Sequence, residues 1–476
     1  MSGSYLAFGV LGMPQGDLVS KQNIKAAGCT HNVVVAFWSQ LQPNGPGTAL
    51  DTTAVATLQS DFDQSVKVGL KIIFEMAIHY PPSWVLTGGN AVEQFVDQSG
   101  NVYNGFGAPS GKQVANWQWS SLGRQYVADF ITKVAAALGS TRISWTVGVK
   151  CGGGYYGELH YPPQTLTPRS DSGCVVTSGN PVVTDSHIGA GDQGLLISGA
   201  GIPGATYVGT VTGGTSFRLS SSPSSQVDVN ATANGTFSLS IGMYSWWGYG
   251  TSMQTGTGLA SDQAVCPLPG YTLFSGTDAQ DSLWINWYIN GLATWILWFV
   301  GQMRAAGWNC NFHVCHPGYG VRSNQPRVSS SAASGYRQAA SLGEDPERII
   351  GAYAHDSKIW AYGTWLNTAD GFPGGTADSD KAAWKKLYEE SLLRNKHFRI
   401  WGENTGNESP TGMQNIFSGY TYGSALSGAS YAGSPSQTYG FQGIFWLNYA
   451  SLTDGSPSHA QLSDLTTAIG AHTATL

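Results

Sequence analysis

Charged residues are scarce in this chain of 476 residues. Its 23 basic and 29 acidic side chains make up 11% of the sequence, whereas soluble proteins usually carry about 25%. The formal net charge is -6, and no run of basic residues occurs. Proteins that follow the phosphates of nucleic acid, or that bind anionic membranes through basic clusters, need such runs. We therefore expect neutral or nearly neutral partners and no nucleic acid among them.

Long apolar runs and closely spaced cysteines are missing as well. No stretch reaches the roughly 18 consecutive apolar residues that a membrane-spanning helix requires, so we expect no membrane insertion. Residues 1–5 lack the basic and apolar regions of a secretory signal. The six cysteines show neither a CxxC spacing nor a Cys/His ligand pattern. We expect them to be buried thiols, and we expect neither a metal nor a cofactor.

Short apolar, β-branched runs alternate with amphipathic helical segments along most of the chain, which is typical of repeated βα units. The expected strands are Tyr5–Val10, Asn32–Trp38, Leu70–Met76, Ile143–Val149, Asn311–His316, Arg348–Ala354, Phe398–Glu403 and Gly443–Asn448. Eight such units predict an α/β protein with a (β/α)8 TIM barrel. In this fold the functional residues come from loops at the C-terminal ends of the strands.

Residues 172–241 differ from the rest of the chain. They contain no Trp and no helical period, and they alternate short β-type runs with Gly and Ser turns. We therefore expect a small all-β insert after the fourth strand, near the rim of the barrel. The predicted domains are a barrel formed by residues 1–171 and 242–476, and an all-β module formed by residues 172–241.

Two glutamates lie at expected strand ends, in settings rich in glycine and aromatic residues. Glu158 lies within the glycine- and tyrosine-rich residues 152–163, and Glu403 ends the seventh expected strand. Strands four and seven face each other across a barrel mouth, and glycoside hydrolysis requires two such carboxyls, one of them a general acid. The alternatives are two solvated loop carboxylates, or a structural pairing of Glu403 with Arg399.

The settings of the two glutamates are similar to motifs of a known enzyme family. Residues 147–162 resemble the strand-four acid motif of the β-amylases, glycoside hydrolase family 14, and Trp401-Gly-Glu403-Asn404 resembles their strand-seven base motif. The resemblance implies an inverting O-glycosyl hydrolase in which Glu158 is the general acid and Glu403 the base. We further expect the tyrosines around Glu158 to favour its protonated form, while Glu403 stays ionised.

Two other interpretations remain open. The retaining β-galactosidase-like families share the barrel and the positions of both carboxyls, and in them Glu403 would be a nucleophile. They usually carry Asn before the acid, where this chain has Gly157. In a non-catalytic glycan-binding adhesin, both carboxyls would only hold sugar hydroxyls.

Further substrate-binding residues are expected among side chains at strand ends that could stack on sugar rings or bind hydroxyls. The candidates are Trp38, His79, Tyr156, His316, Asp356, Trp360, Asn404 and Trp446. Glu75 is a third acidic candidate, although its place within the third strand favours a barrel-core carboxylate paired with a basic side chain. His313, His316 and Asp356 lack the spacing of metal ligands, so no metal site is predicted.

The insert is similar to short Gly- and Thr-rich modules in tail proteins of phages that infect actinobacteria, notably at residues 202–208 and 217–220. The resemblance implies a virion-borne depolymerase that acts on a polysaccharide of the host surface. It also implies a virion or extracellular location and incorporation into a virion tail.

Overall fold

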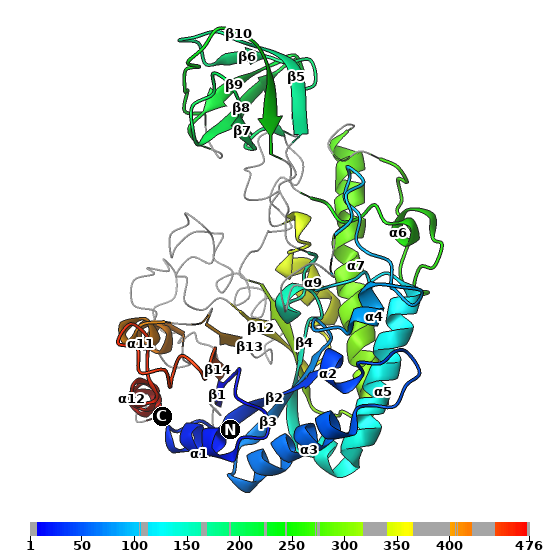
Figure 1. Cartoon of the computed structure of the whole chain (residues 1–476), viewed down its shortest axis with the longest axis vertical. Helices are drawn as coiled ribbons and strands as arrows, with labels where there is room; N and C mark the ends of the chain where they lie inside the picture. Colours follow the sequence, from blue (N-terminus) through cyan, green and yellow to red (C-terminus); the bar gives the residue numbers. More distant parts are fainter. Residues whose placement is uncertain are drawn as a thin grey trace.

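The computed structural model contains a closed barrel of eight parallel strands (Figure 1). It describes residues 7–103, 105, 113–162, 169–189, 192–222, 226–242, 245–271, 273, 277–317, 340–364, 400–404, 406, 408–420 and 443–473. The barrel strands are β1 (Ala7–Val10), β2 (His31–Phe37), β3 (Lys71–Ala77), β4 (Thr146–Cys151), β11 (Asn311–His316), β12 (Ile359–Gly363), β13 (Ile400–Glu403) and β14 (Gly443–Trp446). Each pairs with the next, and β14 pairs with β1. The predicted fold class is confirmed.

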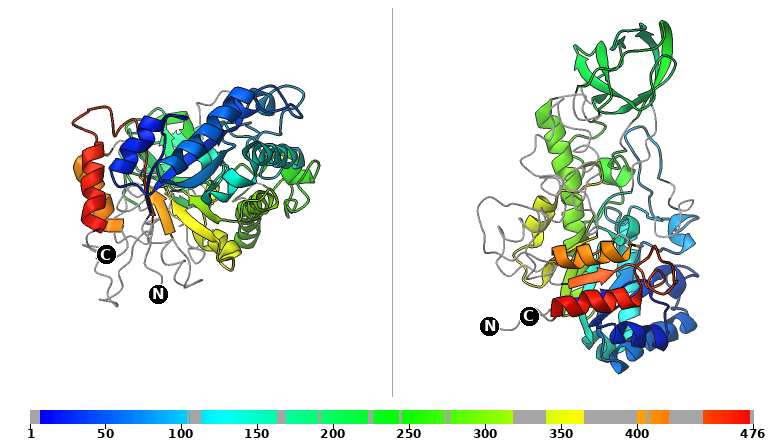
Figure 2. Two further views of the ribbon diagram at one scale, coloured as in Figure 1. Left: turned by 90° about the horizontal axis from the view of Figure 1, so that it is seen from below. Right: turned by 90° about the vertical axis from the view of Figure 1, so that its left-hand side faces the viewer.

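Helices surround the barrel on its outside (Figure 2). The described helices are α1 (Leu18–Ala26), α2 (Trp38–Leu41), α3 (Thr52–Lys67), α4 (Ser83–Leu86), α5 (Ser121–Ser144), α6 (Thr251–Thr255), α7 (Asp278–Ala305), α9 (Pro346–Tyr353), α11 (Pro410–Tyr420) and α12 (Leu462–Thr473). A short 3-10 turn, Tyr155–Gly157, follows β4 at the mouth of the barrel. Within the described residues, a helix follows each barrel strand except β12, after which the description resumes at β13.

Polar side chains start several of these helices. Asp17, Asp51 and Ser120 each accept a hydrogen bond from a backbone N–H of the following first turn. Thr277 and Gln280 form a reciprocal capping box at the start of α7. These caps satisfy N–H groups that have no partner inside a helix, and they fix where each connection from the barrel mouth becomes helical.

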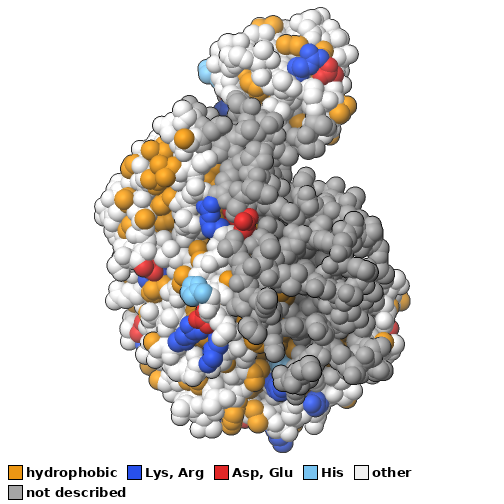
Figure 3. Space-filling model, turned by 180° about the vertical axis from the view of Figure 1, so that it is seen from behind, with side chains coloured by type: hydrophobic (Ala, Val, Ile, Leu, Met, Phe, Trp, Pro, Cys, Tyr) orange, Lys and Arg blue, Asp and Glu red, His pale blue; other side chains and the backbone are white. Residues whose placement is uncertain are grey.

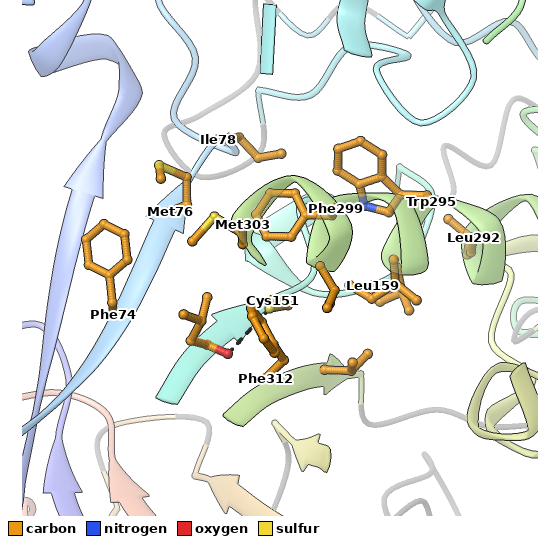
Figure 4. Close-up of a cluster of buried hydrophobic side chains, with 14 of the residues drawn as sticks. Phe74, Met76, Ile78, Cys151, Leu159, Leu292, Trp295, Phe299, Met303 and Phe312 are labelled. Carbon is orange, nitrogen blue, oxygen red and sulfur yellow. Dashed lines mark hydrogen bonds between the residues drawn. The ribbon is translucent and has the colours of Figure 1, made fainter. Parts of the chain in front are cut away.

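The long helix α7 packs against the outer face of strands β3, β4 and β11. Figure 4 shows Leu292, Trp295, Phe299 and Met303 of α7 beside Phe74 and Met76 of β3, Cys151 of β4 and Phe312 of β11. Apolar residues surround nearly the whole helix because its other sides contact further aromatic residues, such as Trp119 against Trp287. None of the helices described is long and apolar enough to cross a membrane.

A second closed barrel, of six antiparallel strands, lies between β4 and α6 and stands apart from the large barrel (Figure 1). Its strands are β5 (Arg169–Val176), β6 (Val182–Thr184), β7 (Leu196–Ser198), β8 (Thr206–Thr212), β9 (Ser216–Ser220) and β10 (Gly235–Ile241). It has an apolar core of its own, which includes Cys174, Phe217 and Leu239. Its first and last residues, Arg169 and Ile241, are register partners in one antiparallel pair.

Some expected strand boundaries differ from the structure. Arg348–Ala354 is wrong as a strand, because these residues belong mainly to helix α9, and the sixth barrel strand is β12. Ile143 lies in the last turn of α5, so β4 begins three residues later than expected. Residues 5–6 and 398–399 of two expected strands lie outside the described residues. The cysteines are free thiols, and five of the six are buried.

Candidate active site

A cavity of about 470 Å³ opens at the C-terminal ends of the barrel strands. Strands from both halves of the barrel, and the loops that follow them, contribute to its wall. It is lined by Leu11, Gly12, Val35, Phe37, Glu75, His79, Tyr80, Lys150, Tyr156, Glu158, Thr364, Glu403, Asn404 and Leu447. Glu158 and Glu403 thus line one cavity, at the end of the barrel where active sites of this fold lie.

The glycine-rich turn that leads to Glu158 is held by buried indole groups. The indole N–H of Trp295, on α7, donates to the carbonyl of Gly152 at 2.7 Å. The indole N–H of Trp117 donates to the carbonyl of Gly153 at 2.6 Å. Both Trp side chains are fully buried. Because core side chains fix two successive carbonyls, the turn holds Glu158 in a defined position at the cavity wall.

Glu158 forms a hydrogen bond with His160. The Nε2 atom of His160 lies 3.1 Å from Oε2 of Glu158, and Nδ1 lies 2.5 Å from the carbonyl oxygen of Tyr161. A carbonyl oxygen only accepts, so Nδ1 carries a hydrogen. The bond to Glu158 then needs one more proton, which lies either on the carboxyl group or on Nε2. This proton lies between the carboxyl group of Glu158, which lines the cavity, and the buried ring of His160.

Glu403 lies at the floor of the cavity and is almost completely buried. The Lys150 ammonium contacts its two oxygens at 3.0 and 3.3 Å, and the Tyr362 hydroxyl donates to Oε2 at 2.8 Å. Burial raises the pKa of Glu403, while Lys150 and Tyr362 counteract that rise. The pKa of Glu403 is raised overall, whereas the sequence led us to expect a carboxyl that ionises readily. The ion pair with Lys150 is the main interaction that favours the carboxylate form.

Lys150 also faces Glu75, at 3.8 Å. Burial alone would lower the pKa of Lys150, but Glu403 and Glu75 raise it above its usual range, so the side chain is an ammonium. Glu75 and Lys150 are direct register partners on β3 and β4. The expected pairing of Glu75 with a basic side chain is confirmed.

Among the predicted substrate-binding residues, His79, Tyr156 and Asn404 line the cavity. His79 is buried, and burial and the charge of Lys150 lower its pKa to about 3, so its ring is neutral. Tyr156 is half exposed at the rim. The Asn404 side chain is buried and exchanges two hydrogen bonds with the backbone of Leu447, so it holds the end of β13 to the end of β14.

The three predicted tryptophans lie elsewhere. Trp38 is fully buried and stacks on Phe130, and Trp446 packs in the layer between strands and helices. Trp360 lies within β12 in the barrel interior and contacts His313 edge-on. None of the three lines the cavity. The structure therefore does not place them where they could stack on a sugar bound in this cavity.

His316 and Asp356 are likewise outside the cavity lining. His316 is buried, and its Nε2 lies 2.7 Å from the hydroxyl of Tyr353. Asp356 precedes β12, at the opposite end of the barrel from the cavity, and binds Arg304 at 2.7 Å. The expectation that it follows a strand is wrong because the sixth strand starts after it. No three His, Cys, Asp or Glu side chains in the described part of the chain group as metal ligands.

The cavity and floor residues that the sequence interpretation missed include Phe37, Tyr80, Lys150 and Tyr362. Lys150 carries a recognisable signal, since it is a lone charged residue within a buried apolar strand, immediately before the glycine-rich turn. Tyr362 could not be found in this way, because its strand was assigned to the wrong residues. Arg399, the alternative partner considered for Glu403, lies outside the described residues.

Comparison with known proteins gives matches in structure only. A scan against protein-family models finds no match, and neither does a search of curated protein sequences. The catalytic domain of β-amylase from Paenibacillus polymyxa superposes with a TM-score of 0.53 and 14% identity, over 98% of this chain and 97% of that one. The class that these data define is a (β/α)8 barrel, shared with glycoside hydrolases.

A second solved structure supports the same class. The β-galactosidase from the psychrophilic Marinomonas ef1 superposes with a TM-score of 0.50 and 11% identity. The match covers 98% of this chain but only 60% of the β-galactosidase. Both of these structures are glycosidases, and what this chain shares with them is the fold.

Proposed function

We propose that this chain is a glycoside hydrolase with Glu158 as general acid and Glu403 as base. The observation that carries the proposal is the single cavity at the barrel mouth into which both carboxyls open. Each has a neighbour suited to its role, since His160 shares a proton with Glu158, and Lys150 and Tyr362 favour the anion of Glu403. The glycosidase identity of the two similar folds agrees with this assignment.

The proposed reaction is a single displacement. Glu158 transfers its proton to the glycosidic oxygen as the bond from that oxygen to the anomeric carbon breaks. Water attacks the anomeric carbon from the other face, and Glu403 takes the proton that the water loses. The product therefore has the inverted anomeric configuration.

Inversion is proposed over retention because of the residue before the acid. The retaining β-galactosidase-like families usually carry Asn at this position, where Gly157 stands here. A Cβ atom on Gly157 would lie 2.7 Å from His79 and 3.2 Å from Glu75, so these side chains already fill that space. Retention remains the second candidate, with Glu403 as nucleophile.

The charge of the cavity favours a neutral sugar. Its lining contains three carboxyl groups, Glu75, Glu158 and Glu403, and one cation, Lys150. A uronic acid in the cavity would face this excess of carboxylates and would have to compete with two of them for Lys150. Among the described residues on the face in Figure 3, charged side chains form only a few small groups. We therefore propose a neutral cell-surface or storage polysaccharide as substrate.

The resemblance of the small β barrel to phage-tail modules suggests where such an enzyme acts. We propose a depolymerase in a virion tail, or otherwise outside the cell, that cleaves a glycan of the host surface. A panel of α-glucans, galactans, arabinans and mycobacterial wall polysaccharides, assayed for new reducing ends, tests which substrate is cleaved. Cleavage of storage glucan alone would contradict the host-surface role.

Glu158→Gln and Glu403→Gln test the catalytic roles. We expect either change to lower kcat on a cleaved polysaccharide by about 10²–10⁴-fold. Glu158→Gln should retain much more activity on a glycosyl fluoride, because fluoride leaves without a proton. Glu347→Gln, in the first turn of α9 and outside the cavity, is the matched control and should retain full activity.

The outcomes separate the candidates. Proton NMR of the first product, recorded before mutarotation, shows an inverted anomer for the proposed mechanism. A retained anomer, or a fluorosugar trapped as an ester on Glu403, would identify the retaining mechanism instead. If no panel member is cleaved and Glu403→Gln only weakens glycan binding, the chain is an adhesin and the proposal fails.

A further inference from the structure

Lys150 is a buried ammonium between two carboxylates that come from different sides of the barrel. Its side chain is 7% exposed, and those of Glu75 and Glu403 are 11% and 8% exposed. Nζ lies 3.0 Å from Glu403 but 3.8 Å from Glu75, although Glu75 is the register partner on the adjacent strand. The amine thus reaches past two intervening strands, β11 and β12, toward Glu403.

This arrangement is not needed to fill the barrel. Burying three charged groups costs solvation free energy, and their mutual attraction often fails to offset that cost in full. Proteins in which apolar side chains of similar volume replace such a cluster are often equally stable. Elsewhere the barrel interior holds an apolar cluster that includes Ile73, Trp401 and Phe445, together with the neutral rings of His31 and His313. A charge cluster in place of further apolar packing, at the floor of the cavity, indicates a role in the chemistry of that cavity.

The groups that face Glu403 act in opposite directions. Lys150 on β4 and the hydroxyl of Tyr362 on β12 stabilise its anion, whereas burial and the negative charge of Glu75 on β3 favour the protonated acid. Cys315 on β11 is also close, but burial raises its thiol pKa well above the usual value, so it is uncharged. The pKa of Glu403 therefore depends mainly on how strongly Lys150 interacts with Glu403 and how strongly with Glu75.

We propose that Lys150 is a positioning residue that holds Glu403 as an oriented anion, and that Glu75, by competing for the same ammonium, sets the pH at which that anion forms. This inference rests on the proposed function, since it gives Glu403 the role of base. Lys150 need not touch the substrate to act in this way. Its charge keeps a buried carboxylate able to accept a proton from water.

Titration of Glu403 by NMR tests the inference directly. The chain has only nine glutamates, so selective labelling with ¹³C at the side-chain carboxyl gives few signals, and Glu403→Gln identifies the one wanted. In Lys150→Met we expect the midpoint of Glu403 to rise by about one pH unit or more. In Glu75→Gln we expect the midpoint of Glu403 to fall, because Lys150 then forms an ion pair with Glu403 alone. Lys150→Arg should restore most of the wild-type midpoint.

The opposite signs make the test decisive. An unchanged midpoint in Lys150→Met, or shifts of the same sign in both variants, would overturn the inference. If Lys150→Met does not fold, as judged by circular dichroism, Glu75→Gln decides alone, and an unchanged or raised midpoint refutes the competition.

The pH dependence of kcat/KM gives a second readout. Its acidic limb should move with the NMR midpoint, upward in Lys150→Met and downward in Glu75→Gln. If the midpoints shift as expected but no glycan is cleaved, the proposed function fails and the control of Glu403 by Lys150 stands. If glycan is cleaved and the midpoints do not shift, only the present inference fails.

Discussion

Gly157 occupies a position where neither the backbone nor the neighbours accept a side chain. Its φ is +78°, in the left-handed region, and an added Cβ would lie 2.7 Å from the His79 ring. The ring of His79 therefore fills the space that a side chain before the acid would need. This packing links the third strand to the turn that carries Glu158.

Gly157→Ala should destabilise the protein more than a glycine substitution that only strains the backbone. Gly88 has a similar φ of +82° but open space around it, so Gly88→Ala is the matched control. We expect the control to cost about 1–2 kcal/mol, and Gly157→Ala about 1–3 kcal/mol more because His79 or Glu75 must shift. Denaturant unfolding measures both. If both variants lose the same free energy of unfolding, the His79 side chain moves aside without a measurable cost and the prediction is wrong.

At the residue level, the sequence identified both candidate catalytic carboxyls but not the groups around them. Glu158 and Glu403 could be found because acidic residues are rare and these two occupy unusual settings. Lys150 was passed over because its effect depends on Glu403, which is distant in sequence and close only once the barrel closes. Trp38 and Trp446 were misassigned because the sequence alone does not show whether a ring at a strand end points into the cavity or toward the surrounding helices.

At the level of secondary structure, the sixth barrel strand was the main error, and its cause is local. Residues 348–354 are apolar and β-branched in part, but Asp345 and Pro346 precede them. Asp345 accepts a hydrogen bond from the Arg348 N–H, and Pro346 occupies the first helical turn, which is a helix-start signature. The actual strand, β12, is a short apolar run after Asp356.

Asp356→Asn tests the consequence of that correction. The Arg304 hydrogen bond lowers the pKa of Asp356 below the ordinary 3.8. The stability that the ion pair contributes is therefore present above the unfolded-state pKa and is lost as the pH falls through the folded one. Both side chains are partly exposed, so we expect a cost of up to about 1 kcal/mol at pH 7.

Two measurements check this prediction. Urea unfolding of wild type and Asp356→Asn should differ at pH 7, and the difference should shrink as the pH falls below 3.8. Glycan cleavage should be unaffected, because Asp356 lies at the end of the barrel remote from the cavity. A large loss of activity would contradict this prediction and would support the original assignment of Asp356 as a substrate-binding residue.

At the level of the whole molecule, the abrupt change in composition after residue 171 predicted a separate β module. The structure contains a closed six-stranded barrel in that region, and its core cluster contains no residue of the large barrel. The sequence could not indicate that Arg169 and Ile241 end as register partners, because pairing between the ends of a long segment depends on the strands between them.

We predict that each barrel folds without the other. Replacement of residues 169–241 by Gly-Ser-Gly is feasible because paired antiparallel residues lie about 5 Å apart. The shortened chain should keep the unfolding transition of the large barrel and its activity on short glycosides, and residues 169–241 should fold alone. Circular dichroism and calorimetry measure both, and loss of the large-barrel transition would contradict the independence of the two barrels.

The paired ends of the small barrel also affect how the large one assembles. Strands β4 and β11 are neighbours in the sheet, yet roughly 160 residues separate them along the chain, so closing that loop carries a large entropic cost. Once the small barrel forms, its ends meet and the effective loop shortens by about 70 residues, which lowers the closure cost by about 0.5 kcal/mol. During synthesis the last strand of the small barrel, which ends at Ile241, is made before β11, which begins at Asn311. We therefore expect an insert that folds first to act as a crosslink, which shortens the loop that must close between β4 and β11.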